Sequence, residues 1–376
     1  MKNITIFGAG MVGKTIAFDL AKNYKVSVID KNNETLNNLK STNIEIETIH
    51  CDIGKIENFG DLLQNCDIAV CAVPGFMGYE TLKKIINTRK NVVDISFFPE
   101  NPFELDKLAK QNNVTAIVDC GVAPGLDNIF LGYYNQKMKI TDFECYVGGL
   151  PKVRKYPFYY KAPFSPIDVI EEYTRKARLV ENFDIVVKEP LSDCEFLEFD
   201  KIGTLEAFNS DGLRTLIHTM PHIKNMKEKT LRYCGHSQNI SVLKESGFFD
   251  KSKIDINGNE VSPLDFTCKI LFKDWHLSPN DEEFTVMRTI IKSNEKIVKI
   301  DLYDETDMSN KCSSMSRTTG YTACAAVNLL LKEQYIVPGI NPPEYIGGNE
   351  DCFKEILNYL HERNIDFSIS EFQNKN

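Results

Sequence analysis

The sequence predicts an α/β protein with a doubly wound parallel sheet in its first third and a second, mixed α/β domain in its middle. Short apolar strands alternate with helical segments over the first 125 residues, which is typical of βαβ units. A glycine-rich loop at 8–13 follows the first strand directly. The strand at 68–73 is apolar throughout, as a strand buried on both faces of a parallel sheet must be.

The elements of the first domain follow one another in a regular order. Apolar, β-prone runs predict strands at 4–7, 26–29, 44–49, 68–73, 92–95 and 115–119. The first helix begins within the glycine motif and repeats Val12, Ile16 and Leu20 at four-residue intervals, so one of its faces should be buried. Further helices are expected near 34–40, 57–65, 78–88 and 104–112.

Beyond residue 126 the simple alternation stops. We expect a strand at 143–149, a helix at 167–175, strand-like runs at 178–187, 268–273, 284–291 and 296–303, and a hairpin turn at 257–259. Two helices with apolar faces, at 314–332 and 351–362, should return to the first domain. The sequence therefore predicts a dinucleotide-binding domain at 1–126, completed by 313–376, and a substrate-binding and oligomerisation domain at 127–312.

Composition excludes several classes of function. The 44 basic and 53 acidic residues give a net charge of −9, which disfavours nucleic acid or an anionic membrane surface as a partner. No apolar run approaches the ~18 residues of a membrane span, and the amino terminus lacks the apolar region of a signal peptide, so we expect a cytoplasmic protein. The 11 cysteines include no CxxC pair and read as reduced thiols, and no metal is expected.

The glycine motif carries the first functional prediction. Gly8 permits a tight turn, Gly10 lets a pyrophosphate approach the backbone, and Gly13 lets the helix pack closely on the strand. A glycine-rich turn without a ligand is the alternative. The strand before the motif and the helix after it favour a Rossmann-type dinucleotide site, in which the helix amino terminus attracts the phosphates.

The end of the second strand indicates which dinucleotide binds. Asp30 lies 17 residues after Gly13, where a carboxylate accepts hydrogen bonds from the adenosine ribose and repels a 2′-phosphate. This favours NAD, although Lys31 would partly offset the repulsion. The other predicted cofactor contacts lie in the same motif and at the carboxyl ends of the strands: Met11, Val12, Asp52, Ile53, Ala72, Val73, Pro74, Cys120, Gly121 and Ala123.

Several longer stretches resemble one family across nearly the whole chain. They are 119–127 (DCGVAPGLD), 148–173 (GGLP to EEY), 211–216 (DGLRTL), 226–233 (MKEKTLRY), 317–320 (RTTG) and 339–344 (GINPPE). In these stretches the sequence resembles the lysine 6-dehydrogenase branch of the saccharopine dehydrogenase-like family. The resemblance implies a Rossmann domain joined to an α/β substrate domain, assembled as a homodimer or homotetramer. It also implies NAD-dependent oxidation of the ε-amine of L-lysine to 2-aminoadipate 6-semialdehyde and ammonia.

That reaction needs a group that accepts a proton and a cation that holds the substrate carboxylate. Asp119 ends a strand on the cofactor side and is a candidate base, with a turn-capping role as the alternative. His236 is a second acid–base candidate, although a lone histidine is more often structural. Candidate substrate-binding residues, each with a surface or structural role as its alternative, are Tyr160, Lys161, Arg214, Thr215, Tyr233 and Arg317.

Two other functions remain open at this point. A saccharopine-type dehydrogenase, which acts on a secondary amine, shares the fold that the resemblance implies. A non-catalytic dinucleotide-binding protein would retain the glycine motif without the reaction.

Overall fold

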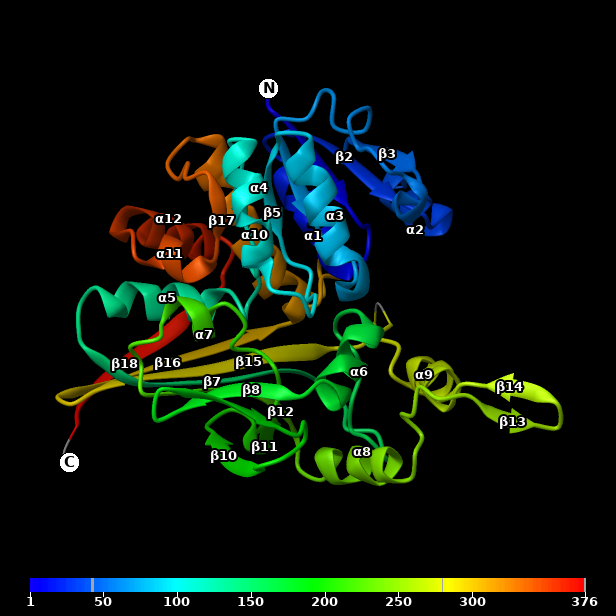
Figure 1. Cartoon of the computed structure of the whole chain (residues 1–376), viewed down its shortest axis with the longest axis vertical. Helices are drawn as coiled ribbons and strands as arrows, with labels where there is room; N and C mark the ends of the chain where they lie inside the picture. Colours follow the sequence, from blue (N-terminus) through cyan, green and yellow to red (C-terminus); the bar gives the residue numbers. More distant parts are fainter. Residues whose placement is uncertain (42–43, 279, 375–376) are drawn as a thin grey trace.

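The first sheet is parallel throughout and has the strand order of a doubly wound fold. The computed structural model describes residues 1–41, 44–278 and 280–374. Seven strands lie in the order β17-β6-β5-β4-β1-β2-β3, and every pairing between them is parallel (Figure 1). These strands are β1 (Asn3–Phe7), β2 (Lys25–Asp30), β3 (Ile46–His50), β4 (Ile68–Cys71), β5 (Asn91–Asp94), β6 (Thr115–Ile117) and β17 (Gly339–Asn341). The predicted fold class is confirmed.

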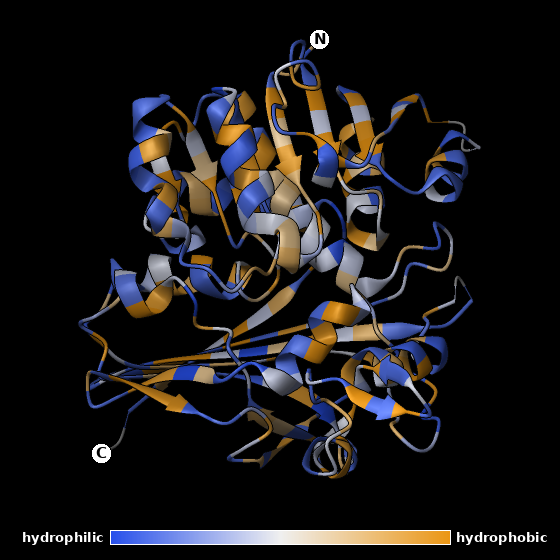
Figure 2. Ribbon diagram, turned by 45° about the vertical axis from the view of Figure 1, so that its right-hand side comes forward, coloured by the Kyte–Doolittle hydropathy of each residue, from blue (hydrophilic) through white to orange (hydrophobic). Residues whose placement is uncertain are grey.

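Helices cover both faces of this sheet because successive side chains of each strand point to opposite sides. Ile4 and Ile6 of β1 belong to the apolar cluster that contains α1 and α10, whereas Phe7 belongs to the cluster of α3 and α4. The apolar strands therefore lie beneath helices with polar outer faces (Figure 2). The helices are α1 (Met11–Leu20), α2 (Asn33–Lys40), α3 (Gly75–Asn87), α4 (Asp106–Gln111), α10 (Ser314–Leu331), α11 (Pro343–Gly347) and α12 (Glu350–His361), with short 3-10 turns at Ile53–Lys55 and Pro102–Leu105.

The second sheet is mixed and lies below the first domain in Figure 1. Its central order is β10-β11-β12-β7-β15-β16-β18, with β8 beside β12 and β9 beside β8. Only β12 and β7 pair in parallel among its described pairings. The strands are β7 (Ile140–Pro151), β8 (Ala177–Glu181), β9 (Asp184–Lys188), β10 (Glu195–Phe199), β11 (Gly203–Asn209), β12 (Asn225–Tyr233), β15 (Glu283–Ser293), β16 (Lys296–Glu305) and β18 (Phe367–Gln373).

Five further helices and a hairpin complete the described part of the second domain. α5 (Leu126–Asn135) lies between the two sheets, and α7 (Leu216–Thr219) lies near it (Figure 1). α6 (Pro166–Thr174), α8 (His236–Glu245) and α9 (Pro263–Asp274) share an aromatic cluster around Trp275. The hairpin of β13 (Ile254–Ile256) and β14 (Asn259–Val261) turns at Asn257 and Gly258, as predicted, and both turn residues have positive φ.

The carboxy-terminal segment contributes to both sheets. β17 extends the first sheet beside β6, and α10 packs on α1 through a shared apolar cluster. β18 instead pairs with β16 at the edge of the second sheet. The segment 313–376, expected to complete the first domain, is therefore divided between the two sheets.

Three predicted elements are wrong in type or extent. Residues 57–65 form turns, since the Asn58 side chain accepts a hydrogen bond from the Gly60 amide and bends the chain. The apolar run at 268–273 belongs to helix α9, which Ser262 caps by accepting the Asp265 amide. The run at 178–187 is two strands, because Asn182 and Phe183 adopt positive φ and reverse the chain.

Candidate active site

One cavity of about 530 Å³ runs along the carboxyl ends of the first sheet, and the second domain forms its other wall. The glycine loop and the ends of β2, β3, β4 and β6 line one end. α6, β7, β12 and the segment after β11 line the other. In a doubly wound sheet this edge is where ligands bind, so the cavity is the candidate active site.

The glycine loop has the geometry of a phosphate cradle. Gly8 has φ +103°, and a Cβ there would lie 2.3 Å from the carbonyl oxygen of Ala72. A Cβ at Gly13 would lie 2.2 Å from the Gly8 oxygen, so α1 packs directly on the loop. Gly10, the N-cap of α1, has open space where a side chain would be. The free amides of the first turn of α1 therefore face a space that suits a pyrophosphate.

Asp30 anchors this loop as well as lining the cavity. One carboxylate oxygen accepts the Ala9 amide at 2.7 Å, and the other accepts the Asn32 amide at 2.8 Å. Each oxygen keeps a further lone pair that can accept a ribose hydroxyl. Lys31 and Asp52 lie on the same part of the wall.

The structure places all but one of the predicted cofactor residues on the cavity wall. Those on the wall are Gly8, Gly10, Met11, Val12, Gly13, Asp30, Lys31, Asp52, Ile53, Ala72, Val73, Pro74, Gly121 and Ala123. Cys120 does not line the cavity. It is fully buried on the opposite side of its strand end, where its thiol lies 3.9 Å from the Thr322 carbonyl oxygen.

Asp119 lies on the wall but is already paired. Its Oδ1 accepts a hydrogen bond from the Arg214 guanidinium at 2.6 Å, while its buried Oδ2 has no hydrogen-bond partner. Burial raises the pKa of Asp119, and the Arg214 charge opposes that rise. Both residues have positive φ, a conformation that persists only where the surroundings hold it. Arg214 itself lies behind the wall and also donates to the Phe98 carbonyl, so its position does not support the predicted carboxylate clamp.

His236 lies away from the cavity in the aromatic cluster around Trp275. One ring nitrogen contacts the Tyr173 hydroxyl at 2.9 Å, and the other contacts the Phe158 carbonyl at 2.8 Å. Burial, assisted by the Arg232 charge, lowers the pKa of His236 to about 3. A neutral, fully enclosed imidazole does not fit the predicted acid–base role.

The other predicted substrate residues also lie behind or beside the wall. Lys161 donates to the His276 carbonyl at 2.8 Å, and the Tyr233 hydroxyl donates to the Pro151 carbonyl at 2.9 Å. Arg317 forms a two-bond ion pair with Asp304. Thr215 is buried behind the cavity wall.

Tyr160 lies outside the cavity wall, but it contacts Arg232, which lines the cavity. The Arg232 guanidinium lies 4.4 Å from the centre of its ring, and Arg232 does reach the cavity. Arg232 also pairs with Glu172 at 2.5 Å, so Tyr160 and Glu172 together fix its position. Arg232 and Tyr233 are neighbours in the sequence, but successive side chains of β12 point to opposite faces of the sheet. Tyr233 therefore points away from the face on which Arg232 lies.

The residues that line the substrate end are not singled out by the sequence analysis. α6 contributes Asp168, Glu171 and Glu172, and Arg175 follows as its C-cap, while Asp211 comes from the segment after β11 and Glu228 from β12. Asp168 accepts the Gly75 amide at 3.1 Å and thereby links α6 to the start of α3. The acidic residues of α6, Asp168 in its first turn and Glu171–Glu172 in its second half, are the signal that could have indicated a polar site.

Arg175 is the least satisfied cation on this wall. Its Nη2 contacts Glu171 at 3.4 Å, and its guanidinium stacks on Phe97 at 4.8 Å. Its Nε and Nη1 are buried and have no hydrogen-bond partner among the described residues. Unpaired donors of this kind favour an anionic ligand, because leaving them unpaired costs free energy.

Comparison with known proteins agrees with this architecture. Residues 4–117 match the model of the saccharopine dehydrogenase NADP binding domain, and residues 121–365 match that of the saccharopine dehydrogenase C-terminal domain. Fold and cavity therefore define a protein with a dinucleotide-binding domain and a second α/β domain. The chain belongs to the saccharopine dehydrogenase family.

Individual relatives are distant. The alpha-aminoadipic semialdehyde synthase of Arabidopsis thaliana is 23% identical over 306 residues, which cover 74% of this chain and 29% of that protein. The saccharopine dehydrogenase (NADP(+), L-glutamate-forming) of Pyricularia oryzae is 23% identical over 260 residues, covering 66% and 58%. The chain therefore spans less than two thirds of the length of either relative.

A solved structure shows the same fold. The apo saccharopine dehydrogenase (L-Glu forming) of Saccharomyces cerevisiae superimposes with a TM-score of 0.78 at 16% identity, covering 99% of this chain and 100% of that one. Among the described residues, no helix is long and apolar enough to cross a membrane.

Proposed function

We propose that this protein is an NAD-dependent dehydrogenase that oxidises the ε-amine of L-lysine to 2-aminoadipate 6-semialdehyde and ammonia. The observation that carries the proposal is the charge of the substrate end of the cavity. Six carboxyl side chains line it, against the guanidinium groups of Arg175 and Arg232; the six are Asp119, Asp168, Glu171, Glu172, Asp211 and Glu228. Four of the six form ion pairs with arginines, whereas Asp168 and Glu228 form none among the described residues. Such a wall favours a substrate that carries more positive than negative charge.

Lysine satisfies that condition, because it carries two ammonium groups and one carboxylate. Saccharopine carries three carboxylates and two ammonium groups, so its net charge is negative. The two acidic side chains that lack a cationic partner therefore favour lysine over saccharopine.

Different residues of the cavity bind the substrate carboxylate and hold the wall beside it in place. When bound, the nicotinamide ring supplies the acceptor for the hydride that leaves the ε-carbon. The unpaired donors of Arg175 bind the substrate carboxylate, in the role first expected of Arg214. The Asp119–Arg214 pair holds the end of β6 in place beside the cavity.

NAD is proposed over NADP on the strength of Asp30 and Asp52. Both carboxylates lie on the wall beside the glycine loop, where a 2′-phosphate would meet negative charge. Lys31 is the one cation on that part of the described wall. The matched family model names NADP, so the cofactor preference needs a direct measurement.

One assay separates the candidate functions. Purified protein is mixed with NAD or NADP and either L-lysine or saccharopine, without added glutamate, and NADH or NADPH fluorescence is followed. Reduction of NAD by lysine alone supports the proposal, and reduction by saccharopine alone supports the saccharopine-type alternative. Tight dinucleotide binding without turnover on either amine indicates a non-catalytic protein. Cytoplasmic location and assembly as a homodimer or homotetramer remain predictions.

A further inference from the structure

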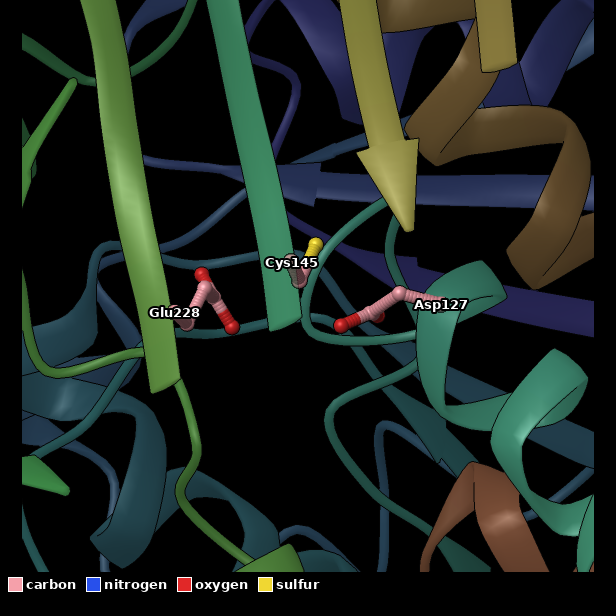
Figure 3. Close-up of side chains that lie close together, drawn as sticks. All are labelled: Asp127, Cys145 and Glu228. Atoms are coloured by element: carbon pink, nitrogen blue, oxygen red, sulfur yellow. The ribbon is translucent and has the colours of Figure 1, made fainter. Parts of the chain in front are cut away.

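Two buried carboxyl groups meet at the inner end of the cavity. Asp127 comes from the start of α5 and Glu228 from β12, with Cys145 of β7 between them (Figure 3). One carboxylate oxygen of Asp127, one of Glu228 and the Sγ atom of Cys145 all lie within 4.8 Å of one another. Asp127 is 0% exposed and Glu228 is 4% exposed.

Neither carboxyl group of this pair forms an ion pair among the described residues. Asp127 Oδ1 accepts the Gly125 amide at 2.9 Å, but Asp127 Oδ2 and Glu228 Oε2 are buried without a hydrogen-bond partner in the part of the chain that the structure describes. When two buried carboxyl groups lie this close together, ionisation of one disfavours ionisation of the other, so we expect the pair to hold a proton. Burial raises the pKa of Asp127 to about 7 and that of Glu228 well above its usual value.

The proton belongs mainly to Glu228. Asp127 lies in the first turn of α5, where the helix amino terminus and the Gly125 amide favour its ionised form. Glu228 faces Asp127, Asp211 and Glu172, which disfavour its ionisation, and Arg214, which favours it. Cys145, the remaining neighbour, is a buried thiol whose pKa is itself raised by burial and by both carboxyl groups.

Glu228 is the member of the pair that reaches the cavity. Its carboxyl group lies against the backbone of Gly212, where a Cβ would be 1.8 Å from Glu228 Oε1. Any larger residue at 212 would push the carboxyl away. Asp127 does not line the cavity and can act only through Glu228.

We propose that Glu228 receives the cationic amine of the substrate and that the Asp127–Glu228 pair releases its proton to solvent when this amine binds. The inference rests on the proposed function, and it identifies the amine-binding group of that site. The entering ammonium supplies the positive charge that the pair lacks, so Glu228 ionises in its presence.

The same carboxylate then prepares the amine for oxidation. A proton moves from the bound ammonium to Glu228, so that an N–H bond breaks, an O–H bond forms, and the electron pair remains on nitrogen. Glu228 is therefore a catalytic residue. Asp127 is a positioning residue, because it sets the proton affinity of Glu228 without touching the substrate.

Isothermal titration calorimetry of L-lysine into protein saturated with NADH tests the proposal without turnover. Titrations in two buffers of different ionisation enthalpy give the number of protons released. The wild-type protein should release about one proton per lysine near neutral pH. The E228Q variant, which keeps the side-chain volume, should release none and bind lysine at least about tenfold more weakly.

Three controls isolate the role of the pair. Norleucine, which lacks the ε-amine, should release no proton and should bind E228Q as well as it binds the wild type. E283Q removes another buried carboxyl, one outside the cavity wall, and should retain the proton release. D127N removes the charge that disfavours ionisation of Glu228, so a larger fraction of Glu228 is already ionised before lysine binds. This variant should therefore release fewer protons at neutral pH, and the pH midpoint of proton release should move to lower pH.

The outcomes distinguish the inference from the function on which it rests. If E228Q releases the same proton, or loses affinity for norleucine as much as for lysine, the role of Glu228 is overturned while lysine binding stands. If the wild-type protein saturated with NADH binds no lysine, the proposed function fails and the inference fails with it.

Discussion

At the scale of single residues, Asp30 serves two purposes that a substitution can separate. It ties down the glycine loop through the Ala9 amide, and it presents negative charge to the cavity. D30N removes the charge while keeping one oxygen acceptor. We expect the ratio of NADP affinity to NAD affinity to rise by about tenfold, because the repulsion of a 2′-phosphate is lost.

Dissociation constants for NADH and NADPH, measured by fluorescence, test this expectation. D30A is the companion variant, since it removes the charge and both backbone contacts together. An equal loss of affinity for both dinucleotides in D30N would show that Asp30 acts on the loop alone.

Arg175 is the residue on which substrate binding is expected to depend. R175Q should raise the KM for lysine by about ten- to a hundredfold and leave the affinity for NADH unchanged, because a charged hydrogen bond to the carboxylate is lost. K161M is the matched control, since Lys161 lies outside the cavity wall and should be neutral for KM. A normal KM in R175Q, with a lowered melting temperature, would make Arg175 structural.

The predicted cofactor residues other than Cys120 lie on the cavity wall, whereas most of the predicted substrate residues lie behind or beside it. The cofactor residues belong to one short motif with fixed spacing, whose backbone conformation its glycines determine. Arg214 and Arg175 look alike in the sequence. Only the fold shows that Arg214 pairs with Asp119 behind the cavity wall, while Arg175 lies on the wall with two unpaired donors.

At the scale of elements, the turn between β1 and α1 allows the effects of glycine substitutions on stability and on NADH binding to be predicted separately. G10A should leave the free energy of unfolding close to that of the wild type, because nothing lies within 4 Å of the added Cβ. It should nevertheless weaken NADH binding at least about tenfold, because the methyl group occupies the place of the pyrophosphate.

G13A is the contrasting variant. Its Cβ would lie 2.2 Å from the Gly8 oxygen, so α1 must move away from the loop. We expect it to cost about 1–3 kcal/mol of stability, measured by urea unfolding. Equal stability of both variants would contradict the packing role assigned to Gly13.

Whether an apolar run forms a strand or part of a helix depends on the residues that precede it and on how much of it is buried. The strands of the first sheet were recognised because full burial requires continuous apolar runs. The run at 268–273 has an apolar centre, but Ser262 and Pro263 begin a helix whose outer residues Phe266 and Ile270 stay exposed. The exposure of an apolar side chain is a tertiary property, so periodicity alone misassigned this segment.

At the scale of the whole molecule, one apolar cluster connects the two sheets. It contains α1 and α10 of the first domain, α5 between the sheets, and inward residues of β7, β15 and β16. A shared core of this kind couples the domains energetically. We therefore expect a single thermal unfolding transition, in which the calorimetric and van't Hoff enthalpies agree.

NAD at about 100 times its dissociation constant should stabilise the folded chain by about 2.7 kcal/mol and shift that transition upward as one. Differential scanning calorimetry with and without NAD measures both properties. Two separate transitions, of which only one responds to NAD, would show that the domains unfold independently.

The sequence by itself determined the doubly wound sheet, the glycine cradle and the position of Asp30, because each depends on spacing within a short stretch of chain. Only the tertiary structure decided which charged residues form the substrate end of the cavity. Arg175 and Glu228 are far apart in the chain and line the same cavity only in the folded protein, where Asp127 also comes to lie beside Glu228. Burial and the pairing of charges arise from that folding, and they decide which carboxyl groups hold a proton and which cations remain free.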